Sequence, residues 1–195
     1  MKFTSFIPAS LLAASVAAAP VAKGNSAFTV ISARSGSPIH LQAINAAGSK
    51  FWVGGSPATF CPSFVNPCPP GNETVWANAF NMDVEVPGGQ TLYVAPSGAL
   101  SFTTAHSMSM PAGSQQGPFD NQQPSSGEEF GTYTTSSFGA TGFMACPDDA
   151  TNASSWQVFA AIRNATVPTG NVDDCLGFDA LTTSYTGSIP TWEYT

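Results

Sequence analysis

The chain has 195 residues, a formal net charge of −7 and an isoelectric point near 4.4, and only 9% of its residues are charged. This acidic balance provides no basic patch to neutralise phosphates, which argues against nucleic acid and anionic membrane surfaces as partners. The 18 Gly and 16 Pro residues, with abundant Ser, Thr, Val and aromatic residues, favour strands and turns over helices. The length and composition predict one all-β domain.

The N-terminus has the pattern of a secretory signal peptide. A short basic start is followed by an apolar stretch, residues 3–18, that ends in small residues and is too short for a transmembrane helix. Because Pro20 disfavours cleavage directly before it, we expect cleavage after Ala17 or Ala18. The predicted division is therefore a signal peptide at residues 1–18 and a secreted domain at residues 19–195.

The first third of the domain is predicted to form a β-hairpin and a third short strand. Residues 28–33 alternate as a strand, and Ser35-Gly36-Ser37-Pro38 breaks it. The chain then resumes at residues 39–43, with Ile39, Leu41 and Ala43 facing inward and His40 and Gln42 facing outward. Residues 51–53 form the third strand.

Residues 74–86 are predicted to form one long strand whose inward face carries Trp76, Phe80, Met82, Val84 and Val86. The clearest hairpin signal follows, with strands at residues 91–95 and 99–103 joined by Pro96-Ser97-Gly98. Proline at the second turn position and glycine where a left-handed residue is required are typical of a tight turn.

The stretch from Pro111 to Glu129 is rich in Gly, Pro, Ser, Gln and Asn and contains one aromatic residue, Phe119. Such a long loop is unusual inside a compact domain, so it is either mobile or an interaction element, and we favour a mobile loop. Further strands are expected at residues 130–135, 143–145, 156–162 and 178–185. The most apolar run, Trp156 to Ile162, is predicted to be a central strand with both faces covered.

Four cysteines permit three disulfide connectivities. Cys61 and Cys68 are close enough to meet in a local turn, and bridging Cys146 to Cys175 would close a loop of about 30 residues around the central strand. We expect the pairs Cys61–Cys68 and Cys146–Cys175. Three N-x-S/T sequons, at Asn72, Asn152 and Asn164, predict glycosylation in the secretory pathway.

Sequence motifs for catalysis are missing: there is no G-x-S-x-G, H-E-x-x-H, C-x-x-C or glycine-rich phosphate loop. His40 and His106 have no sequence reason to meet, so we expect no catalytic residue and no cofactor. The predicted disulfide would, however, bring Asp148-Asp149 near Asp173-Asp174. Four such carboxylates would suit Ca²⁺, which makes this group a candidate metal site.

Several segments resemble the secreted fungal cell-wall proteins of the PhiA type. The matching pieces run in order from about Ser26 to Thr183: SAFTVISARSGSPIHLQAINA, TLYVAPSGALSFTTA, GFMACPDD, SSWQVFAAI and VDDCLGFDA. The Cys61–Cys68 loop and the Pro111–Glu129 stretch depart from the resemblance. It implies a wall glycoprotein of phialide and conidium development, from a family with IgE-binding allergens and no family active site to transfer.

We therefore predict a single all-β domain, either a closed barrel or a β-trefoil-like arrangement of hairpins, with a two-sheet sandwich as the alternative. The predicted function is that of a secreted structural glycoprotein of the fungal cell wall. An alternative is a module that binds wall polysaccharide through the aromatic residues Trp52, Tyr93, Phe119 or Trp192. A polysaccharide-active enzyme is a third hypothesis, because paired carboxylates could flank a sugar cleft.

Overall fold

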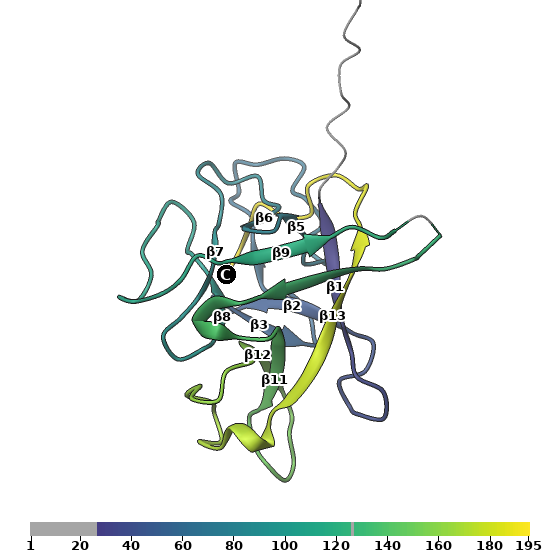
Figure 1. Cartoon of the computed structure of the whole chain (residues 1–195). Helices are drawn as coiled ribbons and strands as arrows, with labels where there is room; N and C mark the ends of the chain where they lie inside the picture. The colour runs from purple at the N-terminus through teal and green to yellow at the C-terminus, as the bar shows by residue number, and fades with distance from the viewer. Residues whose placement is uncertain (1–26, 126) are drawn as a thin grey trace, which may run out of the picture.

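Six antiparallel strands close into a barrel in the computed structural model, which describes residues 27–125 and 127–195. The predicted signal peptide lies outside the described residues. In order around the barrel, the strands are β1 (Phe28–Ala33), β2 (Gln42–Ala47), β3 (Lys50–Val53), β12 (Trp156–Ala160), β11 (Phe143–Pro147) and β13 (Leu176–Ser184) (Figure 1). Pairing of β13 with β1, from Phe28 opposite Ser184 to Ala33 opposite Asp179, completes the ring.

The predicted closed barrel is confirmed, and the sandwich alternative is wrong. Closure leaves these strands without free edges.

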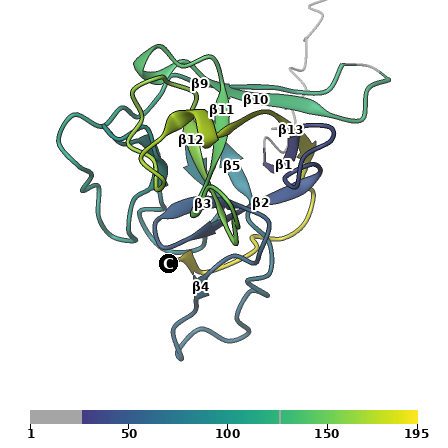
Figure 2. The ribbon, with the colours of Figure 1, turned by 90° about the horizontal axis from the view of Figure 1, so that it is seen from below.

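Shorter strands extend the barrel. On one edge β13 pairs first with β11 and then with β10 (Gly131–Thr135), which pairs with β9 (Phe119–Gln122). The hairpin of β5 (Trp76–Asn78) and β6 (Asn81–Met82) attaches to β1, and that of β7 (Leu92–Val94) and β8 (Leu100–Phe102) attaches to β3. A separate small sheet pairs β4 (Thr59–Phe60) with β14 (Glu193–Tyr194), and the chain beyond β4 extends away from the barrel (Figure 2). Two short 3₁₀ turns, η1 (Ser137–Gly139) and η2 (Val172–Asp174), complete the elements.

The predicted central strand is confirmed. β12 lies between β3 and β11 and has both faces covered. Val158 and Ala160 belong to the cluster inside the barrel, and Phe159 belongs to a second cluster outside it.

Aromatic side chains fill the barrel. Phe51 stacks on Trp76 at 5.3 Å between ring centroids, and Tyr133 continues the contacts to Phe28 and Phe143 at 5.4 and 5.5 Å. The internal cavity measures only about 10 Å³. This volume is near the minimum for one water molecule, so the barrel interior has no room for a ligand.

The strand predicted at residues 39–43 is wrong in its first half. Residues 37–41 form a turn, β2 begins at Gln42, and Leu41 is 56% exposed with a left-handed φ of 57°. The cause is a set of hydrogen bonds to one inward-facing serine. The Ser32 hydroxyl is the hydrogen-bond donor to the Ile39 and Gln42 carbonyls. Leu41 N–H donates to the Ser32 carbonyl at 2.7 Å.

The single strand predicted at residues 74–86 is also wrong, because β5 and β6 form a tight hairpin. The Asn78 side-chain oxygen accepts hydrogen bonds from Phe80 N–H at 2.9 Å and from the Asn81 amide at 3.2 Å, which reverses the chain. Phe80 is consequently 44% exposed, whereas Trp76, Met82 and Val86 are buried as expected.

The loop predicted at residues 111–129 contains a strand. β9 pairs with β10 over four residues, and Phe119 is only 5% exposed. Its ring stacks on Tyr133 with centroids 5.9 Å apart. The expectation of a mobile loop without secondary structure is therefore wrong for residues 119–122, and Phe119 belongs to the core.

Gly131→Ala is expected to lower the free energy of unfolding by about 1–3 kcal/mol, the usual cost of overpacking. A Cβ atom at position 131 would overlap the carbonyl oxygen of Gln122 and lie 2.6 Å from the Thr182 hydroxyl. Gly177→Ala in β13 is the matched control, because a Cβ atom there meets nothing within 4 Å. Urea unfolding of both variants tests this, and equal midpoints would contradict the close approach of β9 and β13 to Gly131.

Candidate functional site

A groove on the outside of the barrel, hereafter the outer groove, has a volume of about 570 Å³. It lies between the β7–β8 hairpin, β12 and the segment 166–168. Its main lining side chains are Lys50, Tyr93, Ser101, Gln157, Phe159 and Thr166. Because the barrel interior is filled, a ligand would have to bind on the outer surface, and this groove is one of the hollows there.

Strand alternation explains why these side chains face the groove. In the β7–β8 hairpin, which is confirmed, Leu92 pairs with Phe102 and Val94 pairs with Leu100 inside the barrel. The pair between them, Tyr93 and Ser101, therefore points outward.

The turn of this hairpin holds one wall of the groove. Gly98 has a φ of 90°, and a Cβ atom there would lie 3.1 Å from Ala165 and 3.2 Å from Ile162. Thr166 N–H donates to the Ser97 carbonyl at 2.8 Å. Glycine lets the turn approach residues 162–166, which brings Thr166 to the groove.

The floor of the outer groove carries polar side chains that have no hydrogen-bond partner among the described residues. Gln157 is 4% exposed and Ser101 is 5% exposed, and neither side chain forms a hydrogen bond with another described residue. The Tyr93 hydroxyl also has no partner among the described residues. The polar atoms of these side chains reach solvent, because Trp76 Nε1 is the one buried and unpaired side-chain polar atom among the described residues. They can therefore exchange water for a polar ligand in the groove.

The groove also has an apolar side. Tyr93, Ala99, Phe159 and Val167 belong to the second hydrophobic cluster, which includes the buried Cys146. At the rim, the exposed Lys50 is the one charged side chain among the described groove residues. The groove therefore combines an apolar wall, neutral polar groups and one cation.

The sequence-based prediction missed Gln157, Ser101 and Lys50. A signal for Gln157 was present, because it is the one polar side chain in the apolar run from Trp156 to Ile162. Its role depends on β8 lying beside β12, a contact that joins residues about 60 positions apart in the sequence.

The four aromatic residues proposed for glycan binding have different surroundings. Tyr93 lines the outer groove. Trp52 lines a different hollow of about 350 Å³, and its indole N–H donates to the Ala47 carbonyl at 2.9 Å. Trp192 is half-buried and contacts the ring of Phe64 edge-on, with centroids 6.1 Å apart. Phe119 is buried in the core, so its proposed exposure is wrong.

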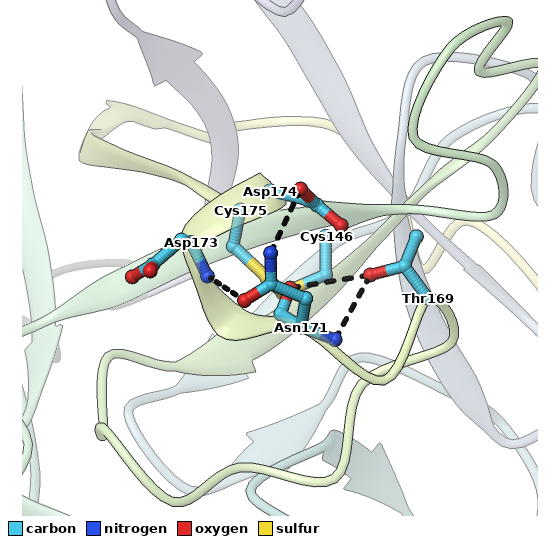
Figure 3. The surroundings of a disulfide bond; sticks show 6 residues. All are labelled: Cys146, Thr169, Asn171, Asp173, Asp174 and Cys175. Carbon is cyan, nitrogen blue, oxygen red and sulfur yellow. Dashed lines mark hydrogen bonds between the residues drawn. A yellow bond between two sulfur atoms is a disulfide. The ribbon is translucent and has the colours of Figure 1, made fainter.

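Both predicted disulfides, Cys61–Cys68 and Cys146–Cys175, are confirmed, and Figure 3 shows the second. The four aspartates near the second bridge nevertheless do not converge. Asp173 and Asp174 point in different directions, and Asp174 accepts a hydrogen bond from the Asn171 amide at 3.2 Å. Within residues 27–125 and 127–195, no group of three or more His, Cys, Asp or Glu residues could hold a metal ion. The proposed Ca²⁺ site at Asp148, Asp149, Asp173 and Asp174 is therefore wrong.

Turn hydrogen bonds explain why Asp148 and Asp149 are not available to a metal. Asp148 accepts from the backbone N–H groups of Ser154 and Ser155 at 2.8 and 3.0 Å, and from the Ser154 hydroxyl. Asp149 accepts from Thr151 and from Asn152 N–H, each at 2.8 Å. Both carboxylates therefore hold the turn between β11 and β12.

The pKa of Asp148 is expected to lie far below its ordinary value of 3.8, first because the Ser154 hydroxyl donates to the carboxylate and then because Ser155 N–H does. Because this pKa is lower in the folded state than in the unfolded state, the ionised carboxylate stabilises the fold at any pH above the unfolded-state pKa. This stabilisation is lost only as the pH falls through the folded-state pKa. Carboxyl NMR should thus show Asp148 still ionised at pH 3. Ser154→Ala should raise the pH midpoint of the Asp148 titration. An unchanged midpoint in that variant would contradict the hydrogen bond from Ser154 as the main cause of the low pKa.

The three sequon asparagines, Asn72, Asn152 and Asn164, are all exposed. Thr74 of the first sequon is 4% exposed, and its hydroxyl oxygen accepts a hydrogen bond from Ala46 N–H at 2.9 Å. Glycosylation at these positions stays a prediction that their exposure permits.

The two histidines lie in separate surroundings. The His40 imidazole accepts a hydrogen bond from Arg34 N–H at 3.2 Å and lines a second hollow with Arg34 and Asp179. His106 is exposed and has a left-handed φ of 59°. Among the described residues, no helix is long and apolar enough to span a membrane.

Comparisons with known proteins relate this chain to secreted proteins. A family model described as PhiA-like secreted protein matches residues 28–195. A protein of Arthroderma benhamiae, named uncharacterized secreted protein, is 46% identical over 154 residues, which cover 78% of this chain and 77% of that protein. No solved structure gives a significant match. Since the family match spans nearly the whole described domain, the chain belongs to the PhiA-like family of secreted proteins.

Proposed function

We propose that this secreted protein is a structural glycoprotein of the fungal cell wall, linked to conidiophore and conidium development, with no catalytic activity or cofactor of its own. The observation that supports it most is the filled barrel, whose internal cavity of about 10 Å³ leaves function to the outer surface. That surface carries the outer groove and three exposed sequons.

The covalent framework is consistent with a long-lived extracellular component. Two disulfides cross-link the domain, and disulfides of this kind persist in oxidising compartments. The barrel and the paired cysteines should keep the groove and the sequons in a fixed arrangement outside the cell.

A second candidate function is binding of wall polysaccharide, and the outer groove favours it. Its polar floor and aromatic wall are the combination that small-ligand sites use. Hydrolysis of a polysaccharide would require two carboxyl groups across a cleft. The described groove residues contribute Gln157, Ser101 and Lys50 but no carboxylate, which favours binding over hydrolysis.

Fractionation of fungal cultures tests the proposal. We expect a tagged protein in isolated walls during conidiation, released by hot detergent without glucanase because the attachment is non-covalent. A strain lacking the protein should form abnormal conidiophores. A protein found in the medium alone, with no affinity for isolated walls, would contradict the proposed function.

A further inference from the structure

The floor of the outer groove selects for a ligand that can both donate and accept hydrogen bonds. The Gln157 carboxamide offers an acceptor oxygen and a donor NH₂, and the Ser101 hydroxyl beside it can do either. Neither side chain has a hydrogen-bond partner among the described residues, so both are available to a ligand in the groove.

An acetamido group matches this floor. It presents one N–H and one C=O, and a carboxamide can exchange a hydrogen bond with each of them. Its methyl group needs an apolar contact, and Ala99, Phe159 and Val167 line the same groove. A plain hydroxyl in that position would lack the methyl group that fills this apolar corner.

Charge favours the acetylated form of the sugar over the deacetylated one. Among the described residues, Lys50 is the one charged side chain lining the groove, so an ammonium group there would meet a like charge and no carboxylate, whereas a neutral amide would meet no repulsion. Tyr93 offers an aromatic ring to the apolar face of a pyranose and a hydroxyl that has no hydrogen-bond partner among the described residues. The volume of about 570 Å³ lies within the usual range for small-ligand sites.

From this arrangement we propose that the outer groove binds N-acetylglucosamine units, with Gln157 pairing with the acetamido group. The inference deepens the proposed wall function and rests on it for biological meaning, although the binding itself can be measured independently. Binding would make the groove a contact between the protein and N-acetylated glycan.

Two sources offer this sugar. One is a chitin chain in the wall, and the other is the first residue of the protein's own N-glycan. Thr166, the third residue of the Asn164 sequon, lines the groove rim, and its N–H is fixed to the Ser97 carbonyl at 2.8 Å. The chemistry is the same in both cases, so the experiment must separate the two.

Titration calorimetry on protein produced with disulfides but without glycans tests the chemistry. We expect saturable binding of triacetylchitotriose, and at least tenfold weaker binding of the deacetylated trimer and of a β-1,3-glucose trimer. Gln157→Leu should weaken the binding of the acetylated trimer at least tenfold. Gln122→Leu, at an exposed position of β9, should leave the affinity unchanged. If Gln157→Leu does not fold, Ser101→Ala and the comparison of the three trimers still test the inference.

Glycosylated protein from a fungal host separates the sources. If the Asn164 glycan occupies the groove, wild type should not bind added trimer and Asn164→Gln should bind it. If the groove is open to chitin, both should bind equally. Equal affinity for all three trimers, or no binding by the unglycosylated protein, would overturn the inference. If the protein associates with walls but does not prefer the acetylated trimer, this inference alone is overturned. If it prefers the acetylated trimer but does not associate with walls, the proposed wall role is overturned.

Discussion

Tyr194→Ala is expected to lower the free energy of unfolding by about 4 kcal/mol or more, since removing a buried aromatic side chain typically costs about 3–5 kcal/mol. Tyr194 lies next to the C-terminus yet is only 2% exposed. Its hydroxyl donates to the Glu73 carbonyl at 2.8 Å and accepts from Val75 N–H at 3.0 Å. The substitution therefore leaves a cavity and two unpaired backbone groups.

The backbone around Tyr194 adds to this loss. Gln90, which is fully buried, donates from its amide to the Tyr194 carbonyl at 2.9 Å and accepts from Tyr194 N–H at 2.8 Å. Thr195 accepts from Gly48 N–H at 2.7 Å through its carbonyl. These bonds tie the last residues to Gln90, which precedes β7, and to the β2–β3 turn, so loss of the Tyr194 ring should release the C-terminal segment from the barrel.

Urea unfolding monitored by tryptophan fluorescence measures the effect. Tyr194→Phe removes the hydroxyl alone and should cost about 1–3 kcal/mol, the penalty for unpaired buried groups. Tyr185→Ala is the control, because Tyr185 is half-buried and its hydroxyl bonds only the nearby Ser188 carbonyl. Equal losses for Tyr194→Ala and Tyr185→Ala would contradict the structural role of the C-terminus.

Replacing Cys146 and Cys175 together by alanine is expected to destabilise the domain more than replacing Cys61 and Cys68. The bridges span 29 and 7 positions. For loops of these sizes, the chain-entropy model gives about 3.6 and about 2.5 kcal/mol. Burial increases the difference, because Cys146 is fully buried in the second hydrophobic cluster whereas Cys68 is exposed.

The two double variants can be compared by urea unfolding under identical conditions. We expect the Cys146/Cys175 pair to cost at least about 1 kcal/mol more than the other pair, which follows from the difference in loop entropy. Alanine is preferred to serine, since it adds no buried hydroxyl. A larger loss for the Cys61/Cys68 variant would show that the loop after β4 supports the fold more than its exposure indicates.

Several features of the fold follow from local sequence. Pro96-Ser97-Gly98 specifies a tight turn, and alternation on either side places Leu92 and Leu100 inside the barrel. The run from Trp156 to Ile162 specifies a strand covered on both faces. Because Cys61 and Cys68 are only 7 positions apart in the sequence, they can pair within one loop.

Other features depend on side-chain hydrogen bonds that composition does not reveal. Asn78 reverses the chain and exposes Phe80, and Ser32 holds the turn that exposes Leu41. The carboxylate of Asp148 binds turn N–H groups instead of a metal. In each case the residue type was visible in the sequence, but its partner was not.

The sequence by itself determined the all-β class, the main hairpin and the central strand, because these depend on contacts within a strand or turn. It limited the disulfides to three connectivities, and the structure shows which one forms. Only the tertiary structure decided that Phe119 is buried and that Lys50, Tyr93, Gln157 and Thr166 line one groove. Those contacts form when β13 closes on β1 and β8 lies beside β12. Barrel closure joins residues far apart in the chain, and local alternation carries no information about which distant strands become neighbours.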